Sequence, residues 1–122
     1  MKTLQEKLGI KSSSRILVMA PPPGYLKIVG LSGAQLGSAP FDFIQLFAKD
    51  RKSLAGRLRE AGGLLSKWGM VWICWRRDGE GGLDSDSVRE AGLKGGLVDV
   101  KIASINGSWS GLKFVYRLKD RG

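Results

Sequence analysis

The feature that most limits the possible folds of this chain is a set of three apolar runs of strand length. The segments between these runs are long enough to hold a helix. The runs are Arg15–Ala20, Phe41–Phe47 and Met70–Trp75. The first and third are apolar at consecutive positions, so a strand built from either has two apolar faces. Strands of this kind are typical of a parallel sheet that helices cover on both sides. The runs therefore predict a buried, mostly parallel central sheet.

Helices are predicted before, between and after these strands. A short helix over Thr3–Leu8 would place Leu4 and Leu8 on one face. The other helices are expected over Tyr25–Val29, from an N-cap at Asp50 to about Lys67, and from an N-cap at Asp84, Ser85 or Asp86 to about Leu93. We also consider a short strand over Ala34–Leu36.

The last part of the chain has the pattern of a hairpin. Leu97–Ile105 and Gly111–Leu118 have strand composition, and Asn106-Gly107 between them is a strong signal for a tight turn. Strands that alternate with helices and then end in a hairpin indicate a sheet with helices on both faces. We therefore predict one three-layer α/β domain over residues 1–122, with a mostly parallel sheet and a C-terminal antiparallel hairpin.

The charge balance is strongly basic. Twenty Lys and Arg residues against eleven Asp and Glu residues give a net charge of +9. Such a chain attracts phosphates, nucleic acid and other anions, so an anionic ligand or nucleic acid is a candidate partner. The basic residues are also spread along the sequence, which favours a solvated surface that keeps the protein soluble over a dedicated site for a polyanion.

Cysteine and histidine usage excludes several classes of site. The chain has one cysteine, Cys74, and no histidine. An intramolecular disulfide is therefore impossible, and zinc or another soft metal lacks its usual ligands. Ser-His-Asp and Cys-His catalysis are excluded for the same reason. We expect no metal site and no catalytic residue, and we interpret Cys74 as a small buried core residue.

The N-terminal residues 1–9 carry charges and lack an apolar segment of signal-peptide length. No window approaches the roughly 20 apolar residues that a membrane-spanning helix requires. A cytoplasmic location without a membrane partner is therefore expected, and the oligomeric state is left open.

Two resemblances follow from short motifs. Phe41-Asp-Phe-Ile44 and Leu64–Ile73 resemble two strand regions of class I methyltransferases, which have a Rossmann-like fold. The chain also resembles, over nearly its whole length, a family of small bacterial proteins classed as a domain of unknown function. The segments that carry this second resemblance are Pro22-Pro-Gly-Tyr25 (P-x-G-Y), Pro40-Phe-Asp-Phe43 (PFDF), Gly96–Lys101 (GLVDVK) and Trp109–Val115 (WSGLKFV). Together they imply a truncated, methyltransferase-like Rossmann fold and no particular activity.

The turn after the first strand departs from what a methyl-donor site requires. Such a site needs a glycine-rich turn whose backbone N–H groups approach the ligand, and it usually needs an acidic residue for the ribose. Here the turn is Ala20–Tyr25, and its three prolines remove three N–H donors. Pro22-Pro23 stands where the bacterial family has an acidic residue before the glycine, and no acidic residue lies between Glu6 and Asp42. We therefore expect no bound cofactor and interpret the turn as a rigid plug.

The carboxyl ends of the strands remain the place to look for a ligand, because open α/β sheets bind ligands there. Tyr25, Trp75, Arg76 and Arg77 are expected near this edge, and Trp109 follows the hairpin turn. Arginines grip phosphate or carboxylate, and aromatic side chains stack on bases. The competing interpretation pairs the arginines with Asp78, Glu80 or Asp84 and buries the tryptophans.

Three functional hypotheses follow. The leading one is a non-catalytic, Rossmann-like binding or regulatory domain that has lost its adenosyl-methionine loop. The first alternative is an enzyme that binds a nucleotide or another anion in the cleft near Tyr25, Arg76 and Arg77. The second alternative is a nucleic-acid binder that relies on charge, with Trp75 or Trp109 stacking on bases.

Overall fold

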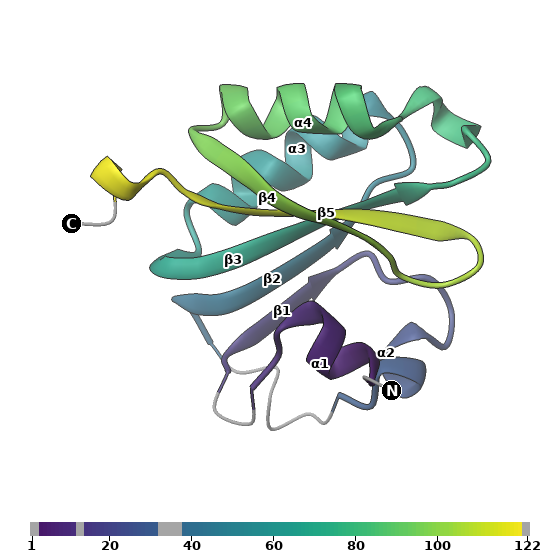
Figure 1. The fold of residues 1–122 in the computed structure, drawn as a ribbon, viewed down its shortest axis with the longest axis horizontal. Coiled ribbons are helices and arrows are strands. Elements are labelled where there is room, and N and C mark those ends of the chain that lie inside the picture. The colour runs from purple at the N-terminus through teal and green to yellow at the C-terminus, as the bar shows by residue number, and fades with distance from the viewer. Residues whose placement is uncertain (1–2, 12–13, 32–37, 121–122) are drawn as a thin grey trace.

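The computed structural model describes residues 3–11, 14–31 and 38–120. Figure 1 shows a twisted sheet with helices on both sides. The helices are α1 (Leu4–Leu8), α2 (Tyr25–Val29), α3 (Arg51–Gly62) and α4 (Ser85–Lys94), and short 3-10 turns cover Glu80–Gly82 and Leu118–Asp120. The strands are β1 (Ile16–Met19), β2 (Phe41–Phe47), β3 (Leu65–Arg76), β4 (Leu97–Ser104) and β5 (Trp109–Tyr116).

Capping side chains fix where three of the helices begin. Thr3, Asp50 and Asp84 each accept a hydrogen bond from the backbone N–H three residues later, and each helix has a reciprocal capping box. A box of this kind satisfies two backbone donors that a helix start otherwise leaves without partners. The predicted N-cap at Asp50 is therefore confirmed. Of the three N-caps considered for the later helix, the structure has Asp84.

The sheet has the strand order β1-β2-β3-β5-β4. Strands β1, β2 and β3 pair in parallel, and β5 is antiparallel to both β3 and β4. It follows that β4 runs in the same direction as β1 to β3, and that β5 alone is reversed. The carboxyl ends of four strands thus lie at one edge of the sheet. The predicted α/β sheet with a C-terminal antiparallel hairpin is confirmed, and the hairpin inserts its second strand beside β3.

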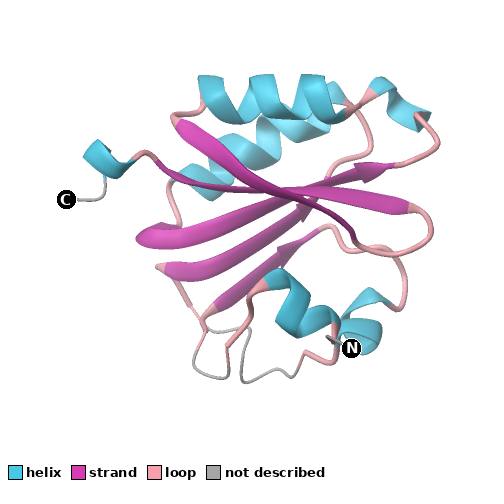
Figure 2. Ribbon diagram, in the orientation of Figure 1, coloured by secondary structure: helices cyan, strands magenta, loops and turns pink. Residues whose placement is uncertain are grey.

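Helices form two outer layers, which makes three layers with the sheet (Figure 2). One face of the sheet packs against α3 and α4 through a cluster that includes Ile44, Leu46, Ile73 and Phe114. The opposite face packs against α1 and α2 through a second cluster that includes Tyr25, Phe47, Trp72 and Cys74. Strand residues alternate between the two clusters, as a pleated sheet requires.

Two boundaries differ from the sequence prediction by several residues. Helix α3 ends at Gly62 rather than near Lys67, and β3 begins at Leu65 rather than Met70. Glycines at 62 and 63 end the helix early, since glycine disfavours helix interiors. The register between β2 and β3 also shifts between Phe41 and Phe43, which lets β3 start before its most apolar part. The strand considered over Ala34–Leu36 lies outside the described residues.

No helix in the described part of the chain is long and apolar enough to cross a membrane.

Candidate functional site

Three connecting segments meet at the carboxyl ends of β1 to β3. The Ala20–Gly24 turn follows β1, the Ala48–Asp50 segment follows β2, and the loop from Arg77 follows β3. The turn after β1 contains a positive φ at Ala20 and another at Gly24, and Tyr25 N–H donates to the Pro22 carbonyl at 3.1 Å. This turn directs the Tyr25 side chain back over the sheet, where a Rossmann-like fold would hold a ligand.

Three aromatic side chains form a row on the α1/α2 face at this edge. The rings of Tyr25 and Phe47 meet edge to face with centroids 4.8 Å apart. The rings of Phe47 and Trp109 meet in the same way at 5.1 Å. Tyr25 is 1% exposed and Phe47 is 2% exposed, while Trp109 is half-buried. We call Tyr25, Phe47 and Trp109 the aromatic row. It occupies space beside the strand ends with protein atoms.

A buried polar chain anchors the first member of the aromatic row. Tyr25 donates its hydroxyl proton to Gln45 Oε1 at 2.7 Å, and Gln45 Nε2 donates to Cys74 Sγ at 3.4 Å. Gln45 is fully buried, so its amide depends on these partners. Burial raises the pKa of the Tyr25 phenol above its ordinary value. The Tyr25 hydroxyl therefore acts as a structural donor rather than as an acid at neutral pH.

Cys74 is a buried core residue, as the sequence predicted. Burial raises the pKa of its thiol to about 12. A reactive cysteine needs thiolate character, and this one is a neutral thiol at physiological pH. In the described part of the chain, no group of three or more His, Cys, Asp and Glu side chains is arranged to hold a metal ion.

The two predicted arginines have different surroundings. Arg76 Nη2 lies 2.7 Å from Asp78 Oδ2 and 3.9 Å from Glu80 Oε2, and its guanidinium stands 5.9 Å from the centre of the Trp109 ring. The Asp78 hydrogen bond raises the pKa of Arg76, and the same bond lowers the pKa of Asp78. Arg77 is exposed and donates to Ser104 Oγ at 3.3 Å. The pairing of Arg76 with Asp78 and Glu80 matches the competing interpretation of the sequence.

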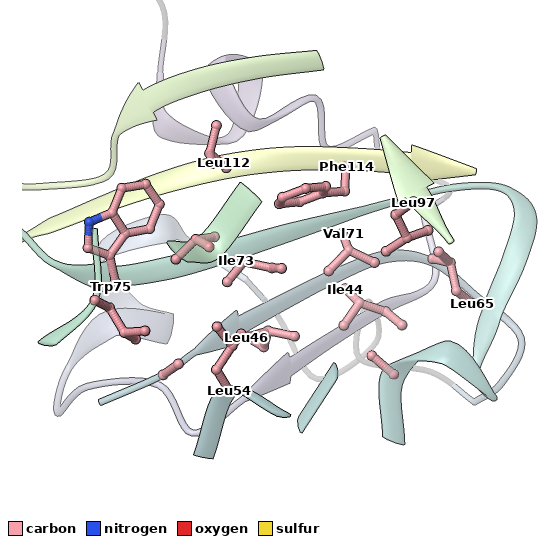
Figure 3. Close-up of a cluster of buried hydrophobic side chains, with 14 of the residues drawn as sticks. Ile44, Leu46, Leu54, Leu65, Val71, Ile73, Trp75, Leu97, Leu112 and Phe114 are labelled. Atoms are coloured by element: carbon pink, nitrogen blue, oxygen red, sulfur yellow. The ribbon is translucent and has the colours of Figure 1, made fainter. Parts of the chain in front are cut away.

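Trp75 does not join this group. It is 5% exposed and belongs to the α3/α4 cluster, which Figure 3 shows. Tyr25 and Trp109 belong to the cluster on the opposite face of the sheet. Trp75 therefore lies at the predicted edge of the sheet, near the end of β3, but on the face opposite to Tyr25 and Trp109. Neighbouring residues of a strand point to opposite faces, so Trp75 and Arg76 cannot both face one ligand.

Sequence reasoning missed Gln45 and Phe47 as parts of this site. The sequence pattern predicts Phe47 only as a core residue of a strand. Gln45 carried a usable signal, because it is the one polar side chain in the buried stretch Phe43–Phe47. A polar residue in a strand that is buried on both faces needs a hydrogen-bond partner, and the Tyr25 hydroxyl is one of the two partners of Gln45 in the described part of the chain.

Two hollows lie on the other face of the sheet. One, of about 780 Å³, lies between the edge strand β1 and α3. It reaches the carboxyl ends of β1 and β2, since Ala20 and Asp50 belong to its lining. The other, of about 530 Å³, lies between α3, α4 and the amino ends of β3 and β4, and includes Leu58 and Leu97. Neither is lined by Tyr25, Arg76, Arg77 or Trp109. The open space described here is thus on the α3/α4 side, away from the aromatic row.

No protein-family model matches the chain, and no curated protein matches its sequence. Solved structures do match. The PH0226 protein from Pyrococcus horikoshii OT3 superposes with a TM-score of 0.65 at 10% identity, over 94% of this chain and 88% of that one. A magnesium protoporphyrin IX methyltransferase from Synechocystis PCC 6803, crystallised with bound SAM (adenosyl-methionine), gives 0.52 at 11% identity. This chain has a methyltransferase-like fold.

The match to the Synechocystis methyltransferase covers 69% of this chain and 42% of that one. A ribosomal protein L11 methylase from Lactobacillus delbrueckii subsp. bulgaricus gives a TM-score of 0.53 at 14% identity, over 92% of this chain and 61% of that one. This chain therefore spans less than two thirds of either methyltransferase. At identities this low the likeness concerns the fold, since function depends on the site residues.

Proposed function

We propose that this chain is a non-catalytic binding or regulatory domain with a methyltransferase-like fold, in which side chains of the protein occupy the place of the methyl donor. The observation that carries the proposal is the buried Tyr25 side chain, which spans from the turn after β1 to Gln45 on β2. A ligand that bound at the strand ends on the α1/α2 face would have to displace this hydrogen bond and the ring contact with Phe47.

The turn after β1 offers few groups for a SAM-like ligand to bind. Pro21, Pro22 and Pro23 have no backbone N–H, and the N–H of Tyr25 is already paired with the Pro22 carbonyl. The acidic residues that follow in sequence serve other purposes. Asp42 accepts from the Arg15 N–H at 3.1 Å at the amino end of β2, and Asp50 caps α3. The carboxylate that follows β2, that of Asp50, is therefore already engaged in the helix cap.

Titration calorimetry with SAM tests the proposal. We expect no saturable binding up to a SAM concentration of about 1 mM. A dissociation constant of that size corresponds to a binding free energy of only about 4 kcal/mol. A SAM-dependent methyltransferase measured in the same buffer provides the positive control. Micromolar SAM binding by the wild-type protein would overturn the proposal, since the aromatic row would then have to move aside for the ligand.

The enzyme alternative requires Tyr25, Arg76 and Arg77 to act on one ligand. Tyr25 is buried and hydrogen-bonded, and Arg76 is paired with Asp78. Of these three residues, Arg77 is the exposed one, and its guanidinium donates to Ser104 Oγ. A thermal-shift screen of nucleotides distinguishes this alternative. It would be favoured by a nucleotide that stabilises the wild-type protein and has no effect on an Arg77→Ala variant.

The nucleic-acid alternative rests on the net charge of +9. Its proposed stacking residues are poorly placed, because Trp75 is buried and the Trp109 ring is flanked by Phe47 and Arg76. Without stacking by Trp75 or Trp109, the positive charge favours anions that are recognised through their phosphate groups. We therefore regard a phosphate-bearing anion as the class of ligand that this binding domain would take.

A further inference from the structure

Three lysines that are far apart in the sequence lie near one another where the end of α1 meets the β4–β5 hairpin. Lys101 on β4 and Lys113 on β5 stand directly opposite each other in the antiparallel register. Lys7 from α1 reaches the end of β4, where its Nζ donates to the Ser104 carbonyl at 2.6 Å. Lys101 Nζ in turn donates to the Lys7 carbonyl at 3.4 Å. We call Lys7, Lys101 and Lys113 the lysine cluster.

Placing like charges opposite each other on paired strands destabilises a sheet. The pKa of Lys113 is lowered by burial and also by the charge of Lys101, which agrees with this repulsion. Arg77, whose Nη1 donates to Ser104 Oγ at 3.3 Å, adds a fourth positive charge beside the Lys7 contact. The fold thus concentrates cations on one surface although their mutual repulsion opposes it.

Among the described residues, no carboxylate forms an ion pair with these four cations. The ion pairs within 4.0 Å in the described part of the chain involve Arg76, Arg89 and Lys94 and use their nearby acidic residues. Lys7 and Lys101 each donate instead to a backbone carbonyl, and Arg77 donates to a hydroxyl. An ammonium group has three N–H donors, so Lys7 and Lys101 each retain donors for another acceptor.

We propose that Lys7, Lys101 and Lys113 bind a compact, multiply charged phosphate group, with Arg77 at the edge of the site. Lysine ammonium groups bind phosphate as point charges, and several phosphate oxygens can accept from several lysines at once. This inference deepens the proposed function, because it gives the binding domain a ligand class and moves the site from the strand ends to the lysine cluster. Charge selects the ligand here, since the neighbouring Trp109 ring is already flanked by Phe47 and Arg76.

Calorimetric titration with inorganic tripolyphosphate tests this site at low and at physiological salt. We expect saturable binding at low salt that weakens as salt screens the charges. Lys101→Gln and Lys113→Gln should each weaken the affinity about tenfold or more, because each removes a charge-assisted contact. Lys52→Gln is the matched control. It removes the same charge from an exposed position on α3, on the other side of the sheet, and should change the affinity by less than about twofold.

Urea unfolding without the anion shows whether the variants fold. Lys101→Gln and Lys113→Gln relieve repulsion, so their stability should equal or exceed that of the wild-type protein. The proposal is overturned if tripolyphosphate does not bind the folded wild-type protein, or if Lys52→Gln weakens binding as much as Lys101→Gln. It is also overturned if a short single-stranded oligothymidylate binds while tripolyphosphate does not. SAM binding would overturn the proposed function without changing the tripolyphosphate result. Failure of the proposed function and failure of the lysine site can therefore be told apart.

Discussion

Trp72→Ala should reduce the free energy of unfolding by about 3–5 kcal/mol, the range measured when a large buried aromatic residue is truncated. Trp72 lies in the middle of β3, is fully buried, and packs in the cluster under α1 and α2. Its Nε1 donates to the Leu8 carbonyl at 2.9 Å, which ties the end of α1 to the sheet. Removal of the ring therefore opens a cavity and leaves a buried carbonyl without its donor. For a domain with ordinary marginal stability, this is a large share of the total.

Urea unfolding followed by far-ultraviolet circular dichroism measures this loss without depending on tryptophan fluorescence. Trp72→Phe separates the two contributions, since it keeps most of the buried area and removes the N–H donor. It should cost about 1–3 kcal/mol. Trp68→Ala makes the same truncation in the same strand at a side chain that is 74% exposed, and should cost less than about 1 kcal/mol. Equal losses for Trp72→Ala and Trp68→Ala would contradict the described packing of β3.

Gly92→Ala should destabilise the protein by about 1–3 kcal/mol, although alanine is the better helix former. Gly92 is buried in α4, and a Cβ atom built on it would lie 2.2 Å from the Phe114 ring. Phe114 is fully buried on β5, so the ring has little room to retreat. The helix would have to move away from the sheet, which would loosen the α3/α4 cluster.

Gly56→Ala is the matched control for this steric effect. Gly56 lies in the middle of α3, and a Cβ atom built on it would have no neighbour within 4 Å. The substitution should therefore raise the stability by up to about 1 kcal/mol through helix propensity alone. Opposite signs for the two variants in urea unfolding are the expected outcome. A stabilising Gly92→Ala would show that α4 does not pack as closely on Phe114 as described.

The sheet could be predicted from the sequence because its three parallel strands are dense apolar runs. The hairpin could be predicted because Asn106-Gly107 marks its turn, and both predictions are confirmed by β1 to β5. The end of α3 was misplaced, since Leu64 and Leu65 continue the helical spacing of apolar residues. The chain leaves the helix at Gly62, and Leu65 begins β3. Periodicity alone does not separate a helix end from a strand start when both are apolar.

The candidate site was harder to predict. Tyr25 was placed at the correct edge, but the sequence does not show that its hydroxyl finds Gln45, which is twenty residues away. Trp75 was grouped with Arg76 because the two are adjacent, whereas the pleat of β3 sends them to opposite faces. The lysine cluster depends on the register of β4 and β5 and on the docking of α1. The positions of basic residues in the sequence indicate neither the strand register nor the docking of the helix.

The protonation of Tyr25 follows directly from the central claim that its side chain lies buried at the strand ends. Burial raises the pKa of this phenol above its ordinary value of 10.0, so the folded protein keeps the proton when the unfolded chain would release it. The unfolded state then binds fewer protons than the native state, and stability falls as pH rises above about 10. The full contribution is present below that pH. Each pH unit in this window weakens folding by about 1.4 kcal/mol per group.

Titration of the phenolate absorbance in a Tyr116→Phe variant measures this property with Tyr25 as the only tyrosine. Circular dichroism recorded at each pH reports whether the protein is still folded. We predict that no phenolate forms near pH 10 while the protein is folded, and that ionisation appears together with loss of secondary structure. A reversible ionisation with a midpoint near 10 in the folded protein would contradict the account. Tyr25 would then be open to water, and the strand ends would be free to receive a ligand.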